Sequence, residues 1–330
     1  MADIRGQRIL VIGGAGFIGS HVVDEVLKED VRQVTVYDNF ARGSYDNLED
    51  SLRDPRMRVF EAGGDIMQTD VLAAAMHESD MVVHLAALWL LQCYDYPRSA
   101  FDVNIRGTFN VLEACRDAKI QRLVYSSSAS VYGDAVELPM TEDHPFNNRT
   151  FYGATKIAGE AMCRAFNDRN GLPYVGLRYM NVYGARQDYK GTYIAVIMKM
   201  LDRLDQGLPP VLFGDGSQAY DFIYVTDCAR ANVCALKSNA TDNFYNVGSG
   251  TRTSLRQLAD MILEITGNAH LGIEFQPAGK TFVTNRVGST EKAESELGFR
   301  SDVGIRDGLA RLIEWRDEHK ALVAERALHA

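Results

Sequence analysis

Tyr152 and Lys156 are the residues of this sequence whose types and spacing most clearly indicate chemistry. Residues four apart on a helix share one face. A phenol has a pKa near 10, and lowering it to about 7 for work as a base requires about 4 kcal/mol of preferential stabilisation of the phenolate. An ammonium group one helical turn away supplies part of that stabilisation. Because the same spacing also occurs by chance on solvated helices, the pair needs supporting residues.

A cluster of hydroxyl residues lies upstream, at Ser126, Ser127, Ser128 and Ser130. Residues 122–126 predict a strand, and ligands of open α/β sheets bind at the carboxyl ends of such strands. A serine there can hydrogen-bond a substrate hydroxyl group while a phenolate removes its proton. A serine-rich turn is the alternative for single members of the cluster. We expect a serine of this cluster to act with the tyrosine and the lysine.

Three spaced glycines follow an apolar strand-like run at residues 8–12 and precede a helix that begins with Phe17 and Ile18. Gly13 permits a tight turn, Gly16 lets the backbone approach a pyrophosphate, and Gly19 allows the helix to pack closely on the strand. The helix N-terminus would then direct unpaired N–H groups at the phosphates. A glycine turn of purely structural value is the alternative. The combination predicts dinucleotide binding.

An acidic residue, Asp38, closes the next predicted strand about 20 residues beyond the glycines, where a carboxylate can accept from an adenosine ribose hydroxyl. A carboxylate would repel a 2′-phosphate, so the sequence favours NAD over NADP, although Arg42 four residues later leaves NADP open. The same loop supplies further expected cofactor contacts, namely Asn39, Arg42, Gly43 and Ser44.

Strand and helix signals alternate from the glycine loop onward, with a long helical stretch near 98–118 and another near 152–170. This alternation predicts an α/β fold, a doubly wound parallel Rossmann sheet followed by a smaller mixed α/β substrate lobe. A strand near 244–247 is expected to rejoin the large sheet. We therefore assign 1–180 and about 225–250 to an NAD-binding domain, about 181–224 and 251–319 to the lobe, and 320–330 to a tail.

Several motifs together resemble the extended short-chain dehydrogenase/reductases of the nucleotide-sugar epimerase and dehydratase group, and most of all the members similar to UDP-glucose 4-epimerase. The resemblance covers nearly the whole chain. The matching motifs are Gly13-x-x-Gly16-x-x-Gly19, Asp38-Asn39, Gly64-Asp65-Ile66, His84-Leu85-Ala86-Ala87, Val103-Asn104-Ile105-Arg106-Gly107-Thr108, residues 126–133, Tyr152-x-x-x-Lys156, and Arg178-Tyr179-Met180-Asn181-Val182-Tyr183-Gly184.

The resemblance implies roles for these residues. Ser128 would hydrogen-bond the substrate hydroxyl and would form the catalytic set with Tyr152 and Lys156. Asp65 and Ile66 would border the adenine, and Lys156 would bind the nicotinamide ribose as well as tune Tyr152. Asn181 would contact the substrate near its diphosphate. The remaining cofactor contacts that it implies are Leu85, Ala86, Ala87, Asn104, Ser126 and Tyr179. The helices near 98–118 and 152–170 resemble those that pair into a four-helix bundle, so a homodimer is expected.

The reaction expected from the resemblance is epimerisation. Dehydratases of this group place an Asp-Glu pair directly after the catalytic hydroxyl residue, where this chain has Ala129 and Ser130. We expect an NAD-dependent nucleotide-sugar epimerase that inverts C4 through a 4-keto intermediate, on UDP-glucose and UDP-galactose or on an N-acetyl or uronic acid analogue. An oxidoreductase or dehydratase of the same family is one alternative, and a non-catalytic NAD-binding sensor or assembly protein is another.

The substrate residues are the least certain part of the pattern. Relatives commonly carry a diphosphate-binding arginine where this chain has Tyr220, and a second such arginine is replaced near Gln276. Arg186, Lys190, Lys280 or Arg286 would substitute for them; the alternative is an unusual substrate. Trp89 lies in a bulky loop and is either a core residue or a wall that restricts sugar size.

The net charge of −9 argues against nucleic acid or an anionic membrane as a main partner. No segment approaches the length of a membrane span, and the start lacks the apolar core of a signal peptide. The five cysteines and seven histidines lack metal-ligand spacing, so no metal is expected. Unpaired thiols predict a reducing, cytoplasmic location.

Overall fold

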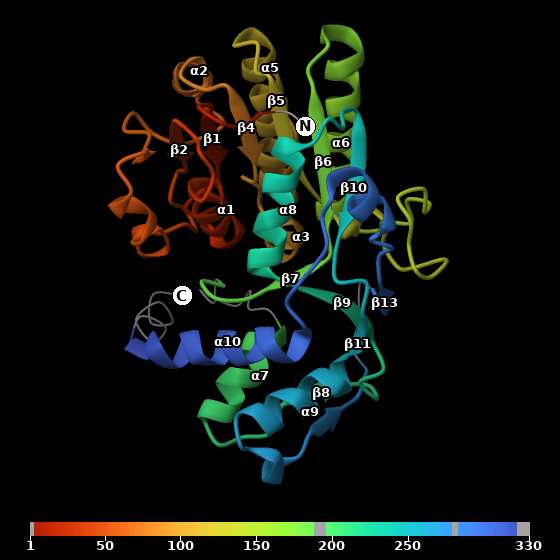
Figure 1. Ribbon diagram of the computed structural model, residues 1–330. Coiled ribbons are helices and arrows are strands. Elements are labelled where there is room, and N and C mark those ends of the chain that lie inside the picture. The colour runs from red at the N-terminus through yellow and green to blue at the C-terminus, as the bar shows by residue number, and fades with distance from the viewer. Residues whose placement is uncertain (1–2, 188–195, 279–282, 322–330) are drawn as a thin grey trace.

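The computed structural model describes residues 3–187, 196–278 and 283–321 (Figure 1). Its largest element is a seven-stranded parallel sheet with the order β10-β6-β5-β4-β1-β2-β3. The strand order reverses between β1 and β4, as in doubly wound nucleotide-binding folds. This confirms the predicted fold class. The strands are β1 (Arg8–Ile12), β2 (Gln33–Tyr37), β3 (Met57–Val59), β4 (Met81–His84), β5 (Arg122–Ser128), β6 (Tyr174–Tyr179) and β10 (Asn243–Val247).

Helices cover both faces of this sheet. On one face α1 (Phe17–Leu27) packs beside α8 (Val225–Lys237), and both contribute to a core that includes Val22 and Val36. On the other face lie α2 (Thr69–His77), α5 (Thr108–Asp117) and α6 (Phe151–Asn170), with Leu72, Val111 and Cys163 in a second core. Burial on both faces explains why the strands read as continuous apolar runs rather than as alternating ones.

The long helical stretch predicted near 98–118 is a composite. It runs from α4 (Pro97–Ala100) through a π-helical segment, η3 (Phe101–Gly107), into α5, and it is preceded by α3 (Leu90–Asp95). Short helical segments elsewhere are η1 (Tyr45–Leu48), η2 (Ser51–Arg53), η4 (Ala129–Val131), η5 (Ala269–Leu271) and η6 (Ala293–Leu297).

The smaller lobe lies below the large sheet in Figure 1. Its four-stranded sheet has the order β11-β9-β13, with β7 also paired to β9, and a separate pair joins β12 to β8. The strands are β7 (Asn181–Tyr183), β8 (Val211–Phe213), β9 (Ala219–Tyr224), β11 (Arg252–Ser254), β12 (Glu274–Gln276) and β13 (Asn285–Arg286). The helices are α7 (Val196–Asp205), α9 (Leu255–Ile265) and α10 (Ile305–Glu318).

Two sequence expectations concern the ends of the large sheet. β5 continues to Ser128, so the hydroxyl cluster lies at the carboxyl end of the strand itself. The strand expected near 244–247 is β10, which pairs in parallel with β6. Within the described ranges, no helix is long and apolar enough to cross a membrane, and the five cysteines are free thiols.

Candidate active site

The glycine loop is shaped by close backbone packing. Gly13 adopts a φ of +82°, and a Cβ at Gly19 would lie 2.0 Å from the carbonyl oxygen of Gly13. Gly16 is the N-cap of α1, and no side chain caps that helix start. The first N–H groups of α1 therefore remain available for an anion, which fits the pyrophosphate of a dinucleotide.

Asp38 braces this loop. One carboxylate oxygen accepts from the Ala15 N–H at 2.9 Å, and the other accepts from the Phe40 N–H at 2.8 Å. Burial raises the pKa of Asp38, while these hydrogen bonds oppose that shift. A Cβ at Gly43 would meet Ala15 at 2.7 Å, so the segment after the acid also packs against the glycine loop.

The other residues of that segment lie around the same loop. The Ser44 N–H donates to the Ala15 carbonyl oxygen at 3.2 Å. The Asn39 side chain accepts from the Ala41 N–H. The Arg42 guanidinium lies 5.0 Å from the ring centre of Trp89. Two segments that flank the dinucleotide region, 38–48 and 88–97, therefore contact each other through a cation–π pair.

The segment after β4 forms the next wall. The N–H groups of Leu85 and Ala86 both donate to the Ile12 carbonyl oxygen. Buried Asn104 accepts from the Leu88 N–H at 2.7 Å and donates to the Leu88 carbonyl oxygen at 2.8 Å and to Thr155 at 3.1 Å. Asn104, expected as a cofactor contact, uses its amide to fix the 88–97 loop against α6. Its place in a π-helical segment is typical of functional sites.

The two predicted adenine-border residues follow β3. Asp65 accepts from the Met67 N–H through its carboxylate and from the Tyr37 hydroxyl through its carbonyl oxygen. Ile66 is buried against Gly107, where any Cβ would lie 2.5 Å from the isoleucine side chain. Both residues follow β3 near the carboxyl end of β2, and their contact with the adenine stays a prediction.

Tyr152 lies in the first turn of α6, which is capped by Thr150 through a 3.0 Å hydrogen bond from the Gly153 N–H. Burial raises the pKa of Tyr152 to about 12, and the opposing influences are a hydrogen bond with Ser128 and the charge of Arg286. Ser128 also accepts from the Ser130 N–H at 3.1 Å, which fixes its hydroxyl oxygen beside the phenol.

Lys156 lies one helical turn further along α6. Its ammonium donates to the Ser126 carbonyl oxygen at 2.7 Å and lies 5.7 Å from the ring centre of Tyr152. Burial lowers the pKa of Lys156 to about 8. The sequence predicts that this cation lowers the pKa of the phenol, but burial is the largest influence on the pKa of Tyr152 and raises it.

Tyr179, at the end of β6, is buried. Its hydroxyl donates to Asn232 at 2.8 Å and is 2.9 Å from the Ser126 hydroxyl. Its polar atom is therefore satisfied within the protein, and only its ring is available to a neighbouring nicotinamide.

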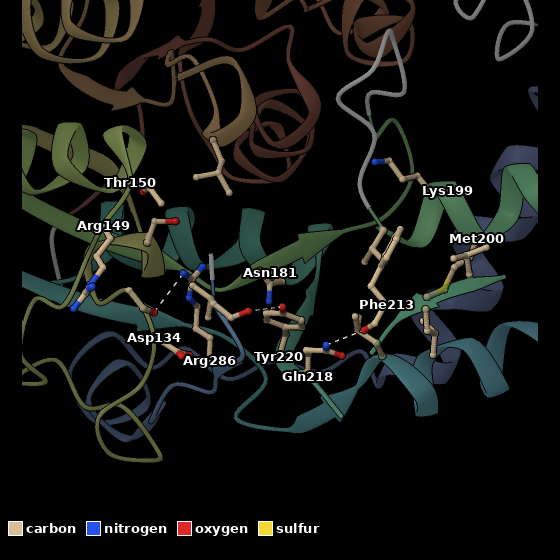
Figure 2. Close-up of a pocket in the computed structure, with 18 of the residues that line it drawn as sticks. Asp134, Arg149, Thr150, Asn181, Lys199, Met200, Phe213, Gln218, Tyr220 and Arg286 are labelled. Atoms are coloured by element: carbon tan, nitrogen blue, oxygen red, sulfur yellow. Dashed lines mark hydrogen bonds between the residues drawn. The ribbon is translucent and has the colours of Figure 1, made fainter. Parts of the chain in front are cut away.

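A pocket of about 740 Å³ adjoins these residues and extends into the smaller lobe (Figure 2). Ser130 and Thr150 line it near the catalytic helix, and Asn181 contributes from β7. Much of the remaining wall is apolar and comes from α7, α9, β8 and the segment just before β13. Its residues are Val196, Met200, Val211, Leu212, Phe213, Leu255 and Val283. The size suits a ligand larger than a monosaccharide.

The predicted substrate residues divide into three groups. Asn181, Tyr220 and Arg286 line the pocket. Arg186 does not; its guanidinium pairs with Asp24 of α1 at 2.6 Å. Trp89 contacts Arg42, whereas its neighbour Leu90 is the one that lines the pocket. Lys190 and Lys280 lie outside the described residues.

Three further cationic side chains, which the sequence did not single out, line the pocket. Arg149 precedes the helix cap, and Lys199 and Arg203 lie on α7. Arg203 is paired with Glu274 at 2.7 Å. The amphipathic spacing of α7 was the only sequence signal for Lys199 and Arg203. Such spacing does not show whether the polar face of a helix lines a pocket or meets solvent.

Comparison with known proteins agrees with this site. The model of the NAD-dependent epimerase/dehydratase family matches residues 9–248. A putative UDP-glucose 4-epimerase of Methanocaldococcus jannaschii is 35% identical over 311 residues, which cover 93% of this chain and 97% of the relative.

Two solved structures are similar over almost the whole chain. The UDP-N-acetylglucosamine 4-epimerase of Methanobrevibacter ruminantium, in complex with UDP-N-acetylmuramic acid, has a TM-score of 0.89 and 29% identity over 96% of this chain and 99% of that one. A dTDP-glucose 4,6-dehydratase of Streptomyces venezuelae with NAD bound has a TM-score of 0.87 and 29% identity, covering 96% and 98%.

The doubly wound seven-stranded sheet defines the class of protein, and the family match names it. This chain belongs to the NAD-dependent epimerase/dehydratase family. Its cofactor is NAD, and the uncapped start of α1 together with the loop braced by Asp38 fits that group.

Proposed function

We propose that this enzyme is a nucleotide-sugar epimerase that inverts C4 through a transient 4-keto sugar. The observation that carries the proposal is the grouping of three residues: Ser128, at the carboxyl end of β5, lies close enough to Tyr152 to lower its pKa, and Lys156 lies 5.7 Å from the phenol ring. The neighbouring residues Ser130 and Thr150 line a pocket large enough for a nucleotide sugar. The names of the M. jannaschii and M. ruminantium relatives support the same reaction.

In this mechanism Tyr152 takes the proton from the sugar O4 as the C4–H bond breaks. Bound NAD supplies the group that accepts the hydride from C4 and returns it. Ser128 hydrogen-bonds the same oxygen and holds it beside the phenolate. Lys156, fixed by the Ser126 carbonyl oxygen, stabilises the phenolate by its charge. The keto sugar then rotates in the pocket so that C4 is reduced on its opposite face, and Tyr152 returns the proton to O4.

The residues that follow Ser128 favour epimerisation over dehydration. Ala129 and Ser130 form η4 and are buried. Loss of water from the sugar needs an acid for the leaving hydroxyl and a base for the adjacent carbon. An alanine and a buried serine supply neither.

The test is to incubate the purified enzyme with UDP-glucose, UDP-galactose and their N-acetyl and uronic acid counterparts. We expect interconversion of one C4 pair, followed by chromatography or NMR, without accumulation of free NADH. Steady release of NADH would indicate an oxidoreductase, and a 4-keto-6-deoxy product a dehydratase. Stable NAD without turnover of any sugar would indicate a binding protein.

We also propose a homodimer that forms through α5 and α6. Exposed aromatic side chains support this surface: Phe101 is 54%, Phe109 41% and Phe151 57% exposed. Such side chains are enriched where chains associate. Light scattering should give twice the chain mass, and Phe109→Glu should shift it toward the monomer.

The remaining expectations stay proposals. Free thiols support a cytoplasmic location. The pairing of β10 with β6 supports an NAD-binding domain of 1–180 plus about 225–250, with the lobe formed by about 181–224 and 251–319.

A further inference from the structure

Arg286 has an unusual environment in the pocket. It belongs to the two-residue strand β13, where it lies opposite Tyr220 of β9 in the parallel register. One of its terminal nitrogens donates to the Gly133 carbonyl oxygen at 3.4 Å, a long hydrogen bond. Its Nε is buried and has no hydrogen-bond partner among the described residues. The guanidinium therefore retains most of its donor capacity for a ligand.

The nearest carboxylate does not neutralise this guanidinium directly. Asp134 acts on Arg286 electrostatically, but its two oxygens already accept from the N–H and hydroxyl of Thr284 and from the N–H of Asn285, at 2.8 to 3.1 Å. Burial lowers the pKa of Arg286 to about 10, so the side chain remains charged at neutral pH. The side chain as a whole is half-buried. A guanidinium that is partly withdrawn from water without a paired anion is costly unless a ligand supplies one.

The position of Arg286 along the pocket indicates which part of the ligand it meets. Its charge acts on Tyr152, and the tyrosine acts on it in turn. In Figure 2 Arg286 lies on the Thr150 side of the pocket, whereas Lys199, Met200 and Phe213 lie on the opposite side. Since the reacting sugar carbon must lie beside the phenol of Tyr152, Arg286 lies at the sugar end of the ligand.

We propose that Arg286 binds a carboxylate carried by the sugar itself, so that the substrate class is a nucleotide sugar with a uronic acid or another acidic sugar. A planar guanidinium with free donors matches a carboxylate in a bidentate pair. This inference rests on the proposed function and narrows it. It also gives Arg286 a role other than binding the diphosphate. Cations at the other end of the pocket, such as Lys199, are placed to bind the diphosphate.

The test measures binding to the NAD-loaded enzyme by calorimetry, with UDP, UDP-glucose and UDP-glucuronic acid as probes. Wild type should bind UDP-glucuronic acid at least tenfold more tightly than UDP-glucose. Arg286→Met should abolish that preference and leave the affinity for UDP unchanged. Arg286→Lys, which keeps the charge but not the planar fork, should retain part of it. Thermal melting checks that each variant is folded.

The matched control is Lys199→Met, which removes one pocket cation at the opposite end. It should leave the ratio of the two sugar affinities unchanged. An equal loss of affinity for UDP and both sugars in Arg286→Met would show that Arg286 binds the diphosphate, and the inference would be wrong. Equal affinity of wild type for both sugars would also overturn it. Because calorimetry reports binding whether or not the sugar is converted, a failure of the epimerase assay leaves this result interpretable.

Discussion

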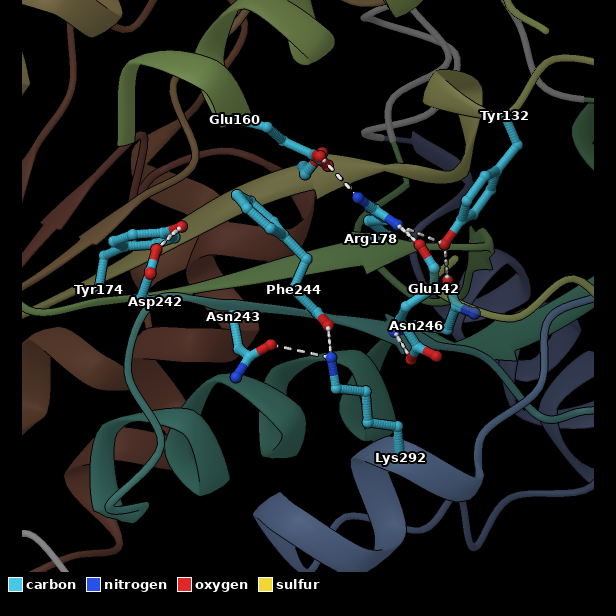
Figure 3. Close-up of polar contacts among 11 residues, drawn as sticks. Tyr132, Glu142, Glu160, Tyr174, Arg178, Asp242, Asn243, Phe244, Asn246 and Lys292 are labelled. Carbon is cyan, nitrogen blue, oxygen red and sulfur yellow. Dashed lines mark hydrogen bonds and ion pairs between the residues drawn. The ribbon is translucent and has the colours of Figure 1, made fainter. Parts of the chain in front are cut away.

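Glu160 of α6 and Arg178 of β6 form a buried ion pair with two hydrogen bonds (Figure 3). The arginine donates from Nε at 2.8 Å and from Nη2 at 2.7 Å to the two carboxylate oxygens. Glu160 lies one helical turn beyond Lys156 on α6, and its carboxylate also accepts from Ser127 of β5 at 2.6 Å. The pair thus joins α6 to β5 and β6, the two strands that carry Ser128 and Tyr179.

The remaining donors of Arg178 extend the contact. Its Nη1 donates to the Tyr132 hydroxyl at 2.8 Å and to the Glu142 carbonyl oxygen at 2.7 Å, and Tyr132 donates in turn to Asn246 of β10 at 2.7 Å. Few donor groups of this guanidinium are left unsatisfied, which is the condition under which a buried ion pair is tolerated.

Breaking this pair should cost much more than breaking an exposed one. Arg178→Met or Glu160→Gln should lower the free energy of unfolding by about 3–5 kcal/mol, because one charged group remains buried alone. Urea denaturation measures the change. Glu264→Gln, which breaks the exposed pair with Arg306, should cost less than about 1 kcal/mol. A similar loss of unfolding free energy from breaking the buried pair and from breaking the exposed pair would contradict the importance assigned to burial.

Removal of the phenol oxygen should stop the reaction without unfolding the protein. Tyr152→Phe keeps the ring but loses the base, so kcat should fall about 10³-fold. Ser128→Ala loses one hydrogen bond to the substrate oxygen and should cost about tenfold. Steady-state kinetics on the substrate found in the sugar panel measures both, and circular dichroism verifies the fold. Full activity in Tyr152→Phe would rule out the assigned base.

The rate should depend on pH through Tyr152 and Lys156. Because burial raises the pKa of the phenol to about 12, the phenolate fraction increases with pH, and kcat/KM should increase from pH 6 upward. Because the pKa of Lys156 is lowered to about 8, its stabilising charge is lost above that pH and the increase should flatten.

Lys156→Met tests this explanation. Without the cation the phenolate is harder to form, so the rising limb should move to higher pH and the rate at pH 7 should fall at least tenfold. Lys156→Arg should recover part of the rate. A uniform loss at every pH, with the shape of the profile unchanged, would mean that the lysine only supports the structure.

Asp38 should matter for both the glycine loop and the cofactor. Asp38→Ala removes the acceptor for the Ala15 and Phe40 N–H groups and should destabilise the protein by about 1–3 kcal/mol. The dissociation constant for NAD should rise at least tenfold, and the preference for NAD over NADP should weaken. Calorimetry on NAD-free protein provides both constants. Glu49→Ala, at an exposed site on the same segment, is the control and should change neither.

The cofactor half of the site could be predicted because its signals are local. The turn at Gly13 and the acid at the end of β2 are fixed by spacing within one βαβ unit, and the structure has strand bounds of Arg8–Ile12 and Gln33–Tyr37 at those positions. The helix from Phe151 to Asn170 begins at a Thr150 cap, a signal that sequence alone carries.

The substrate half could not be predicted in the same way because it depends on contacts between distant segments. Arg186 was a candidate by charge, but it adopts a φ of +62° and pairs with Asp24, about 160 residues away in the chain. Arg286 reaches the pocket only because a two-residue strand pairs with β9. A strand of that length has no periodicity to detect. The Glu160 and Arg178 pair joins two elements by side chains alone and was likewise missed.

The placement of Arg286 on β13 has a practical consequence for engineering. The residues proposed for proton transfer belong to β5 and α6, whereas the residue proposed to bind the sugar lies on a two-residue strand of the four-stranded sheet. A mutant library confined to residues 283–286 and 218–222 would therefore sample new ligand preferences while leaving the residues proposed for proton transfer and NAD binding unchanged.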